Sequence, residues 1–524
     1  MEKHSHLKRG LVLLLLLVLV AGGLVFANRI MAGDAFTKEE AQHGLYGLWV
    51  YRDVQGLDWP AFWHDTQRQM IWPFLHSWIL AVFFFIFGVG YVTARSLSLV
   101  IFFASLYLVY LISLKTSFKN GPRIGMIAVI LGLTSPLMLR FASENMIEGF
   151  GALLFLAAAY TYTLCEEKKI TLEYFILAFL ISLSIFTNYI YAYIMIVAFL
   201  IVTLAKLGPI LMEAMQLSRK GEKSAVRFVW WAYRKMIVLG FLLVLLGSWF
   251  SFSFSRKVLL LVQTVFKYSG GEQVVGLGQN LLYYPQAVIE YLSFSPWVGA
   301  LLLVSLVVPF VTVRYHGTNR LYIYVWTALV LATVTLQAKL PQMIYIIIPF
   351  VFIIFAAVFS CLFENLLQKN KRALSFVLII IIVPIFYSLP SAYAMFFPNI
   401  PAENMVQVLN YFEKTVPAGA SMVIPFNMQR LNQEVAQFHF RERKGSLLTE
   451  PGILQSGLST GGDYYLTVAL DDGSYYQKDV SDDSLSRWNE WLLSRLMEGQ
   501  VRLFSNRRFA SAGLTAKIYQ KTSL

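Results

Sequence analysis

Charged residues and cysteines are both scarce in this chain. Only 14% of its 524 residues are charged and two are cysteines, whereas 57% are hydrophobic and the mean hydropathy is +0.60. This composition excludes a soluble globular protein and indicates a membrane protein. Cys165 and Cys361 lie at or within apolar segments. They therefore provide neither a disulfide framework nor the spacing of a metal site.

Several other signals are absent. The chain has no Asn-x-Ser/Thr sequence, which favours a prokaryotic plasma membrane over a eukaryotic lumenal one. His64 and His76 show no ligand spacing, so we expect no metal or other cofactor; a divalent metal has no support in the sequence. The net charge is +13, but residues 398–524 hold 13 basic and 13 acidic residues and are neutral. The excess therefore reports membrane topology, and we expect no nucleic-acid partner.

Apolar runs of about the length of a membrane-spanning helix recur from residue 11 to about residue 390. We therefore predict a transmembrane domain over residues 1–397 and a soluble α/β domain over residues 398–524. The basic, apolar N-terminus resembles a signal sequence, but its apolar stretch is long and further spans follow. An uncleaved first helix is the better interpretation.

Lysine and arginine indicate the sides of the membrane. The segments that we assign to the inside hold 20 of these residues in 74 positions, and those assigned to the outside hold 10 in 111. The inside segments are 1–10, 115–124, 165–171, 206–236, 314–320 and 364–372, and the outside segments are 29–95, 140–145, 187–190, 255–282 and 337–342. The positive-inside rule then predicts a cytoplasmic N-terminus, about eleven spans and an extracytoplasmic C-terminal domain.

The apolar stretch 72–90 does not fit this scheme as a full span. Counting it as one would move the basic segment 115–123 to the outside. We therefore expect a juxtamembrane or re-entrant helix within a long outer loop, residues 29–95. Loops of that length are more often functional than idle.

Acidic residues gather where this loop begins. In a helix over residues 37–51, Glu39 and His43 share a face, and Thr37 with Glu40 forms a capping box. One interpretation is structural: Glu40 caps the helix, and Asp34 and Glu39 benefit from its dipole. The other interpretation is a carboxylate that acts as a general base at the membrane surface. The spacing alone leaves both open.

Other charged residues lie at the predicted outer surface. The short connection within residues 137–150 carries Arg140, Glu144, Asn145 and Glu148. These charges have two interpretations: Arg140 and Glu144 form a simple ion pair, or this connection is a second polar loop that faces the same site as the first outer loop. Lys339 either snorkels to the interface or binds a lipid phosphate, and Arg256 and Lys257 could bind phosphate in the same way.

The order of these segments resembles that of the C-type membrane glycosyltransferases, in the branch of the dolichyl-phosphate-mannose–protein mannosyltransferases and aminoarabinose transferases. That family opens a juxtamembrane helix with an Asp-Glu pair, which Glu39-Glu40 resembles. A Pro-containing aromatic helix and an Ala-Arg pair follow there, as in residues 72–102 here, including Ala94 and Arg95. The segments "RFASENM", "IFTNYIYAYIMIV" and "AKLPQMIYIIIPF" resemble later family motifs, and the resemblance extends over roughly residues 8–365.

This resemblance implies a polytopic α-helical membrane protein of the C-type glycosyltransferase fold. It further implies inverting transfer of a sugar from a polyprenyl-phosphate donor to a glycan, lipid or protein acceptor on the outer face. The candidate catalytic carboxylates are Glu39, Glu40 and Asp34. Glu39 would be the base, with Asp34 in reserve, and Arg140 and Lys339 would stabilise the phosphate.

Three positions depart from the family pattern. Glu39 replaces an Asp, Asn188 replaces a Lys and Gln342 replaces an Arg. These departures leave open a non-catalytic relative that binds a lipid-linked glycan or a membrane partner. A transporter is disfavoured, because the charges gather at one surface rather than near the midplane.

The C-terminal residues predict a small α/β domain. We expect helices over residues 402–416 and within residues 481–499, strands at "ASMVIPF" and "YYLTVAL", and a final strand pair within residues 502–521. Acceptor recognition or packing over the membrane site is the expected role.

Overall fold

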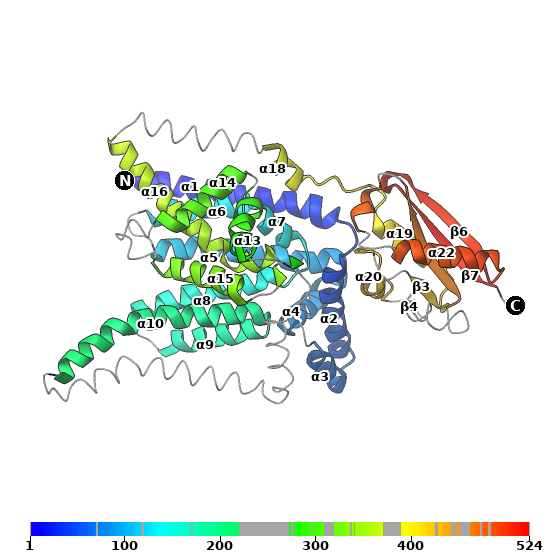
Figure 1. Ribbon diagram of the computed structural model, residues 1–524, viewed down its shortest axis with the longest axis horizontal. Helices are drawn as coiled ribbons and strands as arrows, with labels where there is room; N and C mark the ends of the chain where they lie inside the picture. Colours follow the sequence, from blue (N-terminus) through cyan, green and yellow to red (C-terminus); the bar gives the residue numbers. More distant parts are fainter. Residues whose placement is uncertain are drawn as a thin grey trace. The chain divides into compact units, whose positions relative to one another are not determined.

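A computed structural model of the chain describes sixteen stretches, which hold most of the residues before 220 and most of the C-terminal domain (Figure 1). They are residues 2–69, 72–116, 120–168, 171–219, 272–273, 277–293, 295–308, 319–335, 338–339, 341–369, 389–424, 428–441, 447–449, 462–471, 474–479 and 484–522. The chain forms two compact units. The first contains residues 1–26, 66–76 and 96–397, and the second contains residues 27–65, 77–95 and 398–524.

The first unit is built mainly from apolar helices. They are α1 (Glu2–Val25), α5 (Tyr91–Thr116), α6 (Gly121–Leu133), α7 (Pro136–Ser143), α8 (Glu148–Lys168), α9 (Thr171–Ile185), α10 (Tyr189–Arg219), α13 (Leu277–Tyr291), α14 (Pro296–Val307), α15 (Asn319–Thr335), η4 (Pro341–Ile347), α16 (Ile348–Lys369) and α18 (Leu389–Phe396). The short strands β1 (Glu272–Gln273) and β2 (Ala338–Lys339) pair in antiparallel fashion. Helices α8, α9 and α10 pack side by side (Figure 1).

Four helical segments among the described residues are long and apolar enough to cross a bilayer. They are Gly10–Met31, Tyr91–Lys115, Glu148–Cys165 and Gln342–Phe363. A fifth candidate is the pair α6 and α7, which is bent by 66°. The chain is thus an integral membrane protein. The predicted number of about eleven spans stays a prediction, because several of the expected segments lie outside the described residues.

Large side chains hold the first unit together through aromatic contacts. The Phe155 ring lies 5.0 Å from the Phe350 ring and 5.4 Å from the Tyr324 ring, measured between centroids. Phe199 contacts both Phe155 and Tyr324. Helices α8, α10, α15 and α16 therefore share one aromatic core.

The second unit begins where α1 ends. The segment η1 (Phe26–Met31) continues α1, and the helices α2 (Lys38–Gln55), α3 (Trp59–Gln67) and α4 (Leu75–Phe87) follow. The helix that we predicted over residues 72–90 is therefore present and has 13 residues. At 1.5 Å per residue it is about 20 Å long, too short to cross a bilayer core of about 30 Å. It ends at Gly88, whose φ of +81° favours glycine.

The C-terminal part of the second unit is a mixed five-stranded sheet with helices. Its strands are β3 (Met422–Ile424), β4 (Leu447–Thr449), β5 (Tyr464–Leu470), β6 (Val501–Phe509) and β7 (Leu514–Lys521), in the spatial order β4-β3-β5-β7-β6. The pairs of β3 with β4 and with β5 are parallel, and those of β7 with β5 and with β6 are antiparallel. The helical elements are α19 (Met405–Thr415), α20 (Gln433–His439), η6 (Tyr475–Asp479), α22 (Ser484–Met497) and η7 (Ala510–Ala512). The predicted α/β elements, including the final strand pair, are confirmed.

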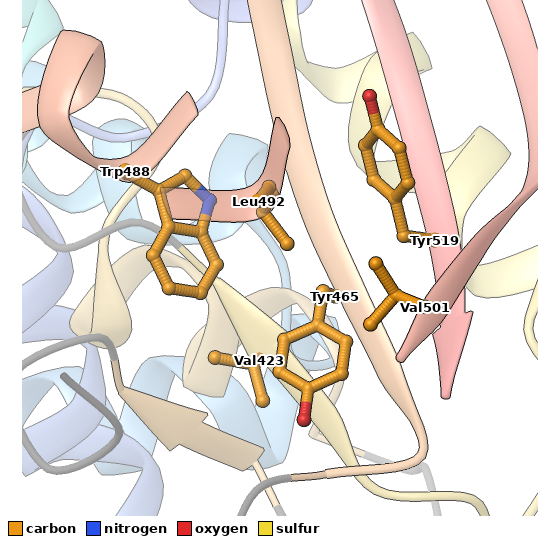
Figure 2. Close-up of a cluster of buried hydrophobic side chains, with 6 residues drawn as sticks. All are labelled: Val423, Tyr465, Trp488, Leu492, Val501 and Tyr519. Carbon is orange, nitrogen blue, oxygen red and sulfur yellow. The ribbon is translucent and has the colours of Figure 1, made fainter. Parts of the chain in front are cut away.

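A cluster of buried side chains joins α22 to this sheet. Trp488 and Leu492 of α22 pack over side chains from the strands in Figure 2. The strand residues are Val423, Tyr465, Val501 and Tyr519. The Trp488 Nε1 donates a hydrogen bond to the Leu466 carbonyl (3.2 Å), which satisfies the one polar atom of the indole.

Candidate functional site: an acidic helix start in the second unit

The predicted capping box fixes the start of α2. Thr37 is the N-cap, and its Oγ1 accepts a hydrogen bond from the Glu40 amide (3.4 Å). In return, Glu40 Oε2 accepts from the Thr37 amide (3.0 Å). Two of the unpaired amides at the helix start are thereby satisfied. The prediction that Glu40 caps this helix is confirmed.

Glu40 also forms a buried ion pair with Arg95. The Arg95 Nε lies 2.8 Å from Glu40 Oε1, and Nη2 lies 3.0 Å from Oε2. Both side chains are almost fully buried, at 4% and 1% exposed. This two-bond geometry matches a planar guanidinium to a carboxylate, so it fixes the helix start as well as neutralising its charge.

Arg95 also contacts the backbone that precedes α2. Its Nη1 donates to the Asp34 carbonyl (2.8 Å). A Cβ at Gly33 would lie 2.5 Å from that same Nη1 and 2.4 Å from the Arg29 carbonyl. Glycine is therefore required at position 33, because any side chain would displace the arginine or the backbone.

The Asp34 carboxylate is buried, and both of its oxygens accept hydrogen bonds. Oδ1 accepts from the amides of Ala35 (2.7 Å) and Met405 (2.8 Å), and Oδ2 accepts from the Tyr476 hydroxyl (2.7 Å). Arg430 lies 3.8 Å from Oδ2 and donates to the Ala35 carbonyl. Burial, and next the charge of Asp34, raise the pKa of Tyr476 far above its usual value, so its hydroxyl stays a donor. The segment before α2 is thus held by side chains and backbone of the C-terminal domain.

Glu39 differs from the two neighbouring acids. It lies in the first turn of α2, like Glu40, but its side chain is exposed. His43, one turn further along, is buried. Among the three predicted catalytic carboxylates, Glu39 alone is open to solvent, whereas Asp34 and Glu40 are committed to structural contacts.

Aromatic rings pack α2 against α20. Phe36 lies 4.6 Å from Tyr91 and 4.8 Å from Phe438, measured between ring centroids. A Cβ at Gly44 would lie 2.8 Å from the Phe36 ring and 3.2 Å from the Phe438 ring. The absence of a side chain at Gly44 therefore lets the two helices approach. Arg441 adds a hydrogen bond to the Val89 carbonyl (3.0 Å).

A buried histidine lies beside these rings. The Nδ1 of His439 is 3.0 Å from the Tyr91 hydroxyl, and its Nε2 is 3.8 Å from Glu413. Burial, assisted by the nearby charge of Arg441, lowers the pKa of His439 to about 4. His439 is therefore neutral at physiological pH.

The second predicted polar loop lies in the first unit. Arg140 and Glu144 form the expected i,i+4 ion pair (3.1 Å), with side chains 54% and 22% exposed. Asn145 and Glu148 are buried where α8 begins. The expected ion pair is therefore present, whereas the loop as a second polar part of the site and the role of Arg140 in phosphate binding stay predictions.

Asn188 has a local structural role. Its Oδ1 accepts from the amides of Ile190 (3.0 Å) and Tyr191 (3.3 Å), at the start of α10. A lysine has no acceptor and could not form this cap. The neighbouring Tyr191 donates to the Gln342 carbonyl (2.6 Å), which links α10 to η4. The departure from the family pattern at position 188 therefore accompanies a helix cap.

The other predicted phosphate ligands are only partly described. The backbone of Lys339 pairs with that of Glu272 in the two-stranded β1–β2 ribbon. The Lys339 side chain, Arg256 and Lys257 lie outside the described part of the chain. Within the part that is described, no group of three or more His, Cys, Asp or Glu side chains has the arrangement of a metal site.

Sequence reasoning missed several residues around the acids. The sequence presents Arg95 only as part of an Ala-Arg pair, and it does not single out Arg430 or Tyr476. Tyr476 lies 442 positions from Asp34, so no local spacing connects the two. The available signal was the burial expected of an aspartate between apolar residues, since a buried carboxylate requires partners.

Residues 72–216 match the family model of the dolichyl-phosphate-mannose-protein mannosyltransferases. None of the curated proteins gives a significant match.

The fold is similar to that of ArnT from Cupriavidus metallidurans. The apo structure of ArnT has a TM-score of 0.58 at 12% identity, with 97% of each chain covered. The ArnT structure bound to undecaprenyl phosphate has a TM-score of 0.57, with the same identity and coverage. A weaker likeness, with a TM-score of 0.49 at 13% identity, is to the oligosaccharyltransferase AglB from Archaeoglobus fulgidus; it covers 82% of this chain and 64% of AglB. The resemblance to C-type glycosyltransferases is thus confirmed: the chain has the fold of ArnT, and its residues 72–216 match the dolichyl-phosphate-mannose-protein mannosyltransferase family.

Proposed function

We propose that this protein transfers a sugar from a polyprenyl-phosphate donor to an acceptor on the extracytoplasmic face of the membrane. The ArnT-like fold and the matched family segment support the reaction class. The ArnT structure with undecaprenyl phosphate supports the kind of donor. The charge pattern of the sequence supports a cytoplasmic N-terminus and an extracytoplasmic C-terminal domain.

Glu39 is the proposed general base, and its exposure is the observation that carries this assignment. The carboxylates of Asp34 and Glu40 are buried and already accept hydrogen bonds from fixed partners. A general base must reach the proton of its substrate, which Glu39 alone of the three can do. Glu40 and Asp34 then hold the helix start that presents Glu39.

The chemistry is a single displacement. Glu39 takes the proton of the acceptor hydroxyl, whose oxygen bonds to the anomeric carbon as the bond to the lipid phosphate oxygen breaks. The phosphate leaves as an anion, and the configuration at the anomeric carbon inverts. Cations near the leaving phosphate would stabilise its developing charge. Arg140, Lys339, Arg256 and Lys257 are the predicted cations.

The substitution Glu39→Gln tests the base. We expect kcat to fall by about 10²-fold or more, because a neutral amide cannot accept the proton. Transfer is measured in proteoliposomes with undecaprenyl or dolichyl phosphate that carries labelled mannose or aminoarabinose. Binding of the labelled donor should be unchanged, and Glu39→Asp should keep part of the activity. Glu498→Gln, at an exposed acid in the C-terminal domain, is the matched control.

Two outcomes would contradict the proposal. Equal transfer by Glu39→Gln and the unsubstituted protein would remove Glu39 from the mechanism. Retention of configuration at the anomeric carbon would exclude the single displacement.

A further inference from the structure

An apolar groove lies between α1, α5 and α6 in the first unit. It has a volume of about 500 Å³. One wall is formed by residues of α1, namely Leu11, Leu14, Leu15, Val18 and Leu19. The other walls contain Phe103 and Tyr107 of α5 and Val129 of α6. This volume falls within the range of about 300–1,000 Å³ that is typical of ligand sites.

Two glycines mark the ends of the groove along α1. At Gly10 a Cβ would lie 3.4 Å from the Met126 sulfur, so α1 contacts α6 there. At Gly22 a Cβ would lie only 2.2 Å from the Phe103 ring, so α1 lies directly against α5. Between these contacts the helices separate. The part of α1 that lines the groove, Leu11 to Leu19, spans about 12 Å of helix.

The surroundings of the groove restrict its occupant to hydrocarbon. The segments Gly10–Met31 and Tyr91–Lys115, which supply most of the lining, are both candidate membrane spans. Several lining side chains are exposed, among them Leu15 at 58% and Tyr107 at 63%. In a bilayer these side chains face lipid chains rather than water. The lined length of about 12 Å is close to one leaflet, which is half of a hydrocarbon core of about 30 Å.

Basic residues lie at the Gly10 end of the groove. Lys115 is in the last turn of α5, and Arg123 is in the first turn of α6; both are exposed. A Cβ at Gly121 would lie 3.0–3.3 Å from the backbone of Ser113 and Leu114, so these two helix ends are close together. Cations at a helix end near the bilayer surface attract anionic headgroups.

We propose that this groove binds one acyl chain of an anionic phospholipid whose phosphate lies near Lys115 and Arg123. The donor polyprenyl phosphate is the competing lipid. It is disfavoured because the acids proposed for transfer follow the opposite end of α1, and because the Gly22–Phe103 contact closes the groove toward that end. A polyprenyl chain is also much longer than one leaflet. The site rests on the membrane spans and not on the proposed transferase activity.

Lipid retention tests the proposal directly. The full-length protein is purified in detergent, exchanged with dioleoyl phosphatidylglycerol, dioleoyl phosphatidylcholine or undecaprenyl phosphate, and analysed by native mass spectrometry. We expect one phosphatidylglycerol to be retained, and less phosphatidylcholine. Leu15→Trp should lower this retention about ten-fold by filling the groove. Leu16→Trp is the matched control, because Leu16 is 52% exposed on the same helix but does not line the groove.

Substitution of the basic residues separates headgroup from chain recognition. In the double variant Lys115→Gln and Arg123→Gln, the preference for phosphatidylglycerol over phosphatidylcholine should disappear. Arg502→Gln, in the C-terminal sheet, should keep it. Persistence of the preference in the double variant would overturn the assigned headgroup contacts.

Photolabelling keeps the proposal testable if a variant fails to fold. Phosphatidylglycerol with a diazirine-bearing chain should label the unsubstituted protein within residues 11–19 and 103–110. Equal retention by Leu15→Trp and Leu16→Trp, or labelling elsewhere only, would overturn the proposal. So would labelling of the groove by a diazirine undecaprenyl phosphate but not by the phospholipid. Because these readouts measure binding alone, an inactive Glu39→Gln variant should give the same lipid results as the unsubstituted protein.

Discussion

Two arginine–glutamate ion pairs among the described residues, Arg95–Glu40 and Arg140–Glu144, have opposite character. Arg95 and Glu40 lie 55 positions apart in the sequence, are almost fully buried and share two hydrogen bonds. Arg140 and Glu144 lie one helical turn apart and are partly exposed. The two pairs have similar distances, 2.8 Å and 3.1 Å, so distance alone does not separate them.

The difference lies in what happens when one partner is removed. Water solvates an exposed charge that has lost its partner, so the exposed pair contributes only about 0–1 kcal/mol. A buried charge has no such replacement, and the loss of its partner costs about 3–5 kcal/mol. We therefore expect the buried pair to hold the start of α2 in place, and the exposed pair to matter more for ligands than for stability.

Arg95→Met should have the largest effect on stability. It leaves Glu40 buried without its cation, so the free energy of unfolding should fall by about 3–5 kcal/mol. Chemical denaturation in detergent measures this change. Adding Glu40→Gln should recover part of the loss, because glutamine keeps the capping box without the charge. A loss below about 1 kcal/mol in Arg95→Met would place the buried pair in the same class as the exposed one.

His439 extends the comparison to a buried group that titrates. Its pKa is about 4 in the folded protein, against 6.5 for an ordinary histidine, so the unfolded chain binds the proton more readily. Stability should therefore be constant above about pH 6.5 and fall as the pH decreases toward 4, by up to about 1.4 kcal/mol per pH unit. Tyr91, Glu413 and Arg441 are the polar groups near the ring.

Unfolding curves at several pH values test this slope. His439→Gln should make the dependence between pH 4 and 6.5 shallower. His64→Gln should leave it unchanged, because the His64 side chain is 72% exposed. The same slope in both variants would show that other groups cause it.

Tyr476→Phe should have an intermediate effect. It removes one hydrogen bond from the buried Asp34 carboxylate while the ring stays in place, which should cost about 1–3 kcal/mol. Tyr393→Phe is the control, since Tyr393 is exposed and retains its ring contact with Phe397. Equal melting behaviour of the two variants would show that Asp34 does not depend on the tyrosine.

Arg140→Gln should have the smallest effect on stability, at most about 1 kcal/mol. Its effect on donor binding is then informative, because the protein remains folded. A raised KM for the polyprenyl-phosphate sugar would support Arg140 as a phosphate ligand. An unchanged KM would exclude Arg140 as a phosphate ligand.

The features predicted from the sequence are those that depend on neighbouring residues. Thr37 and Glu40 are three positions apart, so their capping box follows from spacing. The Arg140–Glu144 pair and the helix within residues 72–90 follow in the same way. The short apolar run "YYLTVAL" predicts a buried strand, and the final strand pair within residues 502–521 corresponds to β6 and β7.

The contacts that hold the acids could not be predicted, because they join distant parts of the sequence. Nothing near Arg95 identifies Glu40 as its partner, and nothing near Asp34 identifies Tyr476 or the Met405 amide. Asp34 is the reserve catalytic acid of the sequence prediction because the family has an aspartate at the base position, and the sequence does not show that this carboxylate is buried. At position 188 the sequence shows only that an asparagine replaces the lysine of the family, whereas the structure shows that Asn188 caps α10.

The partners of Asp34 also set an order of events during synthesis. Tyr476 is made 442 residues after Asp34, which corresponds to roughly 20–90 s at bacterial to eukaryotic elongation rates. For most of that interval the Asp34 carboxylate must remain hydrated, because the Met405 amide is made only 371 residues after Asp34 and the tyrosine later still. The loop that carries Glu39 therefore reaches its final form only when the end of the chain has been made. Prematurely terminated chains should accumulate with this loop accessible to proteases.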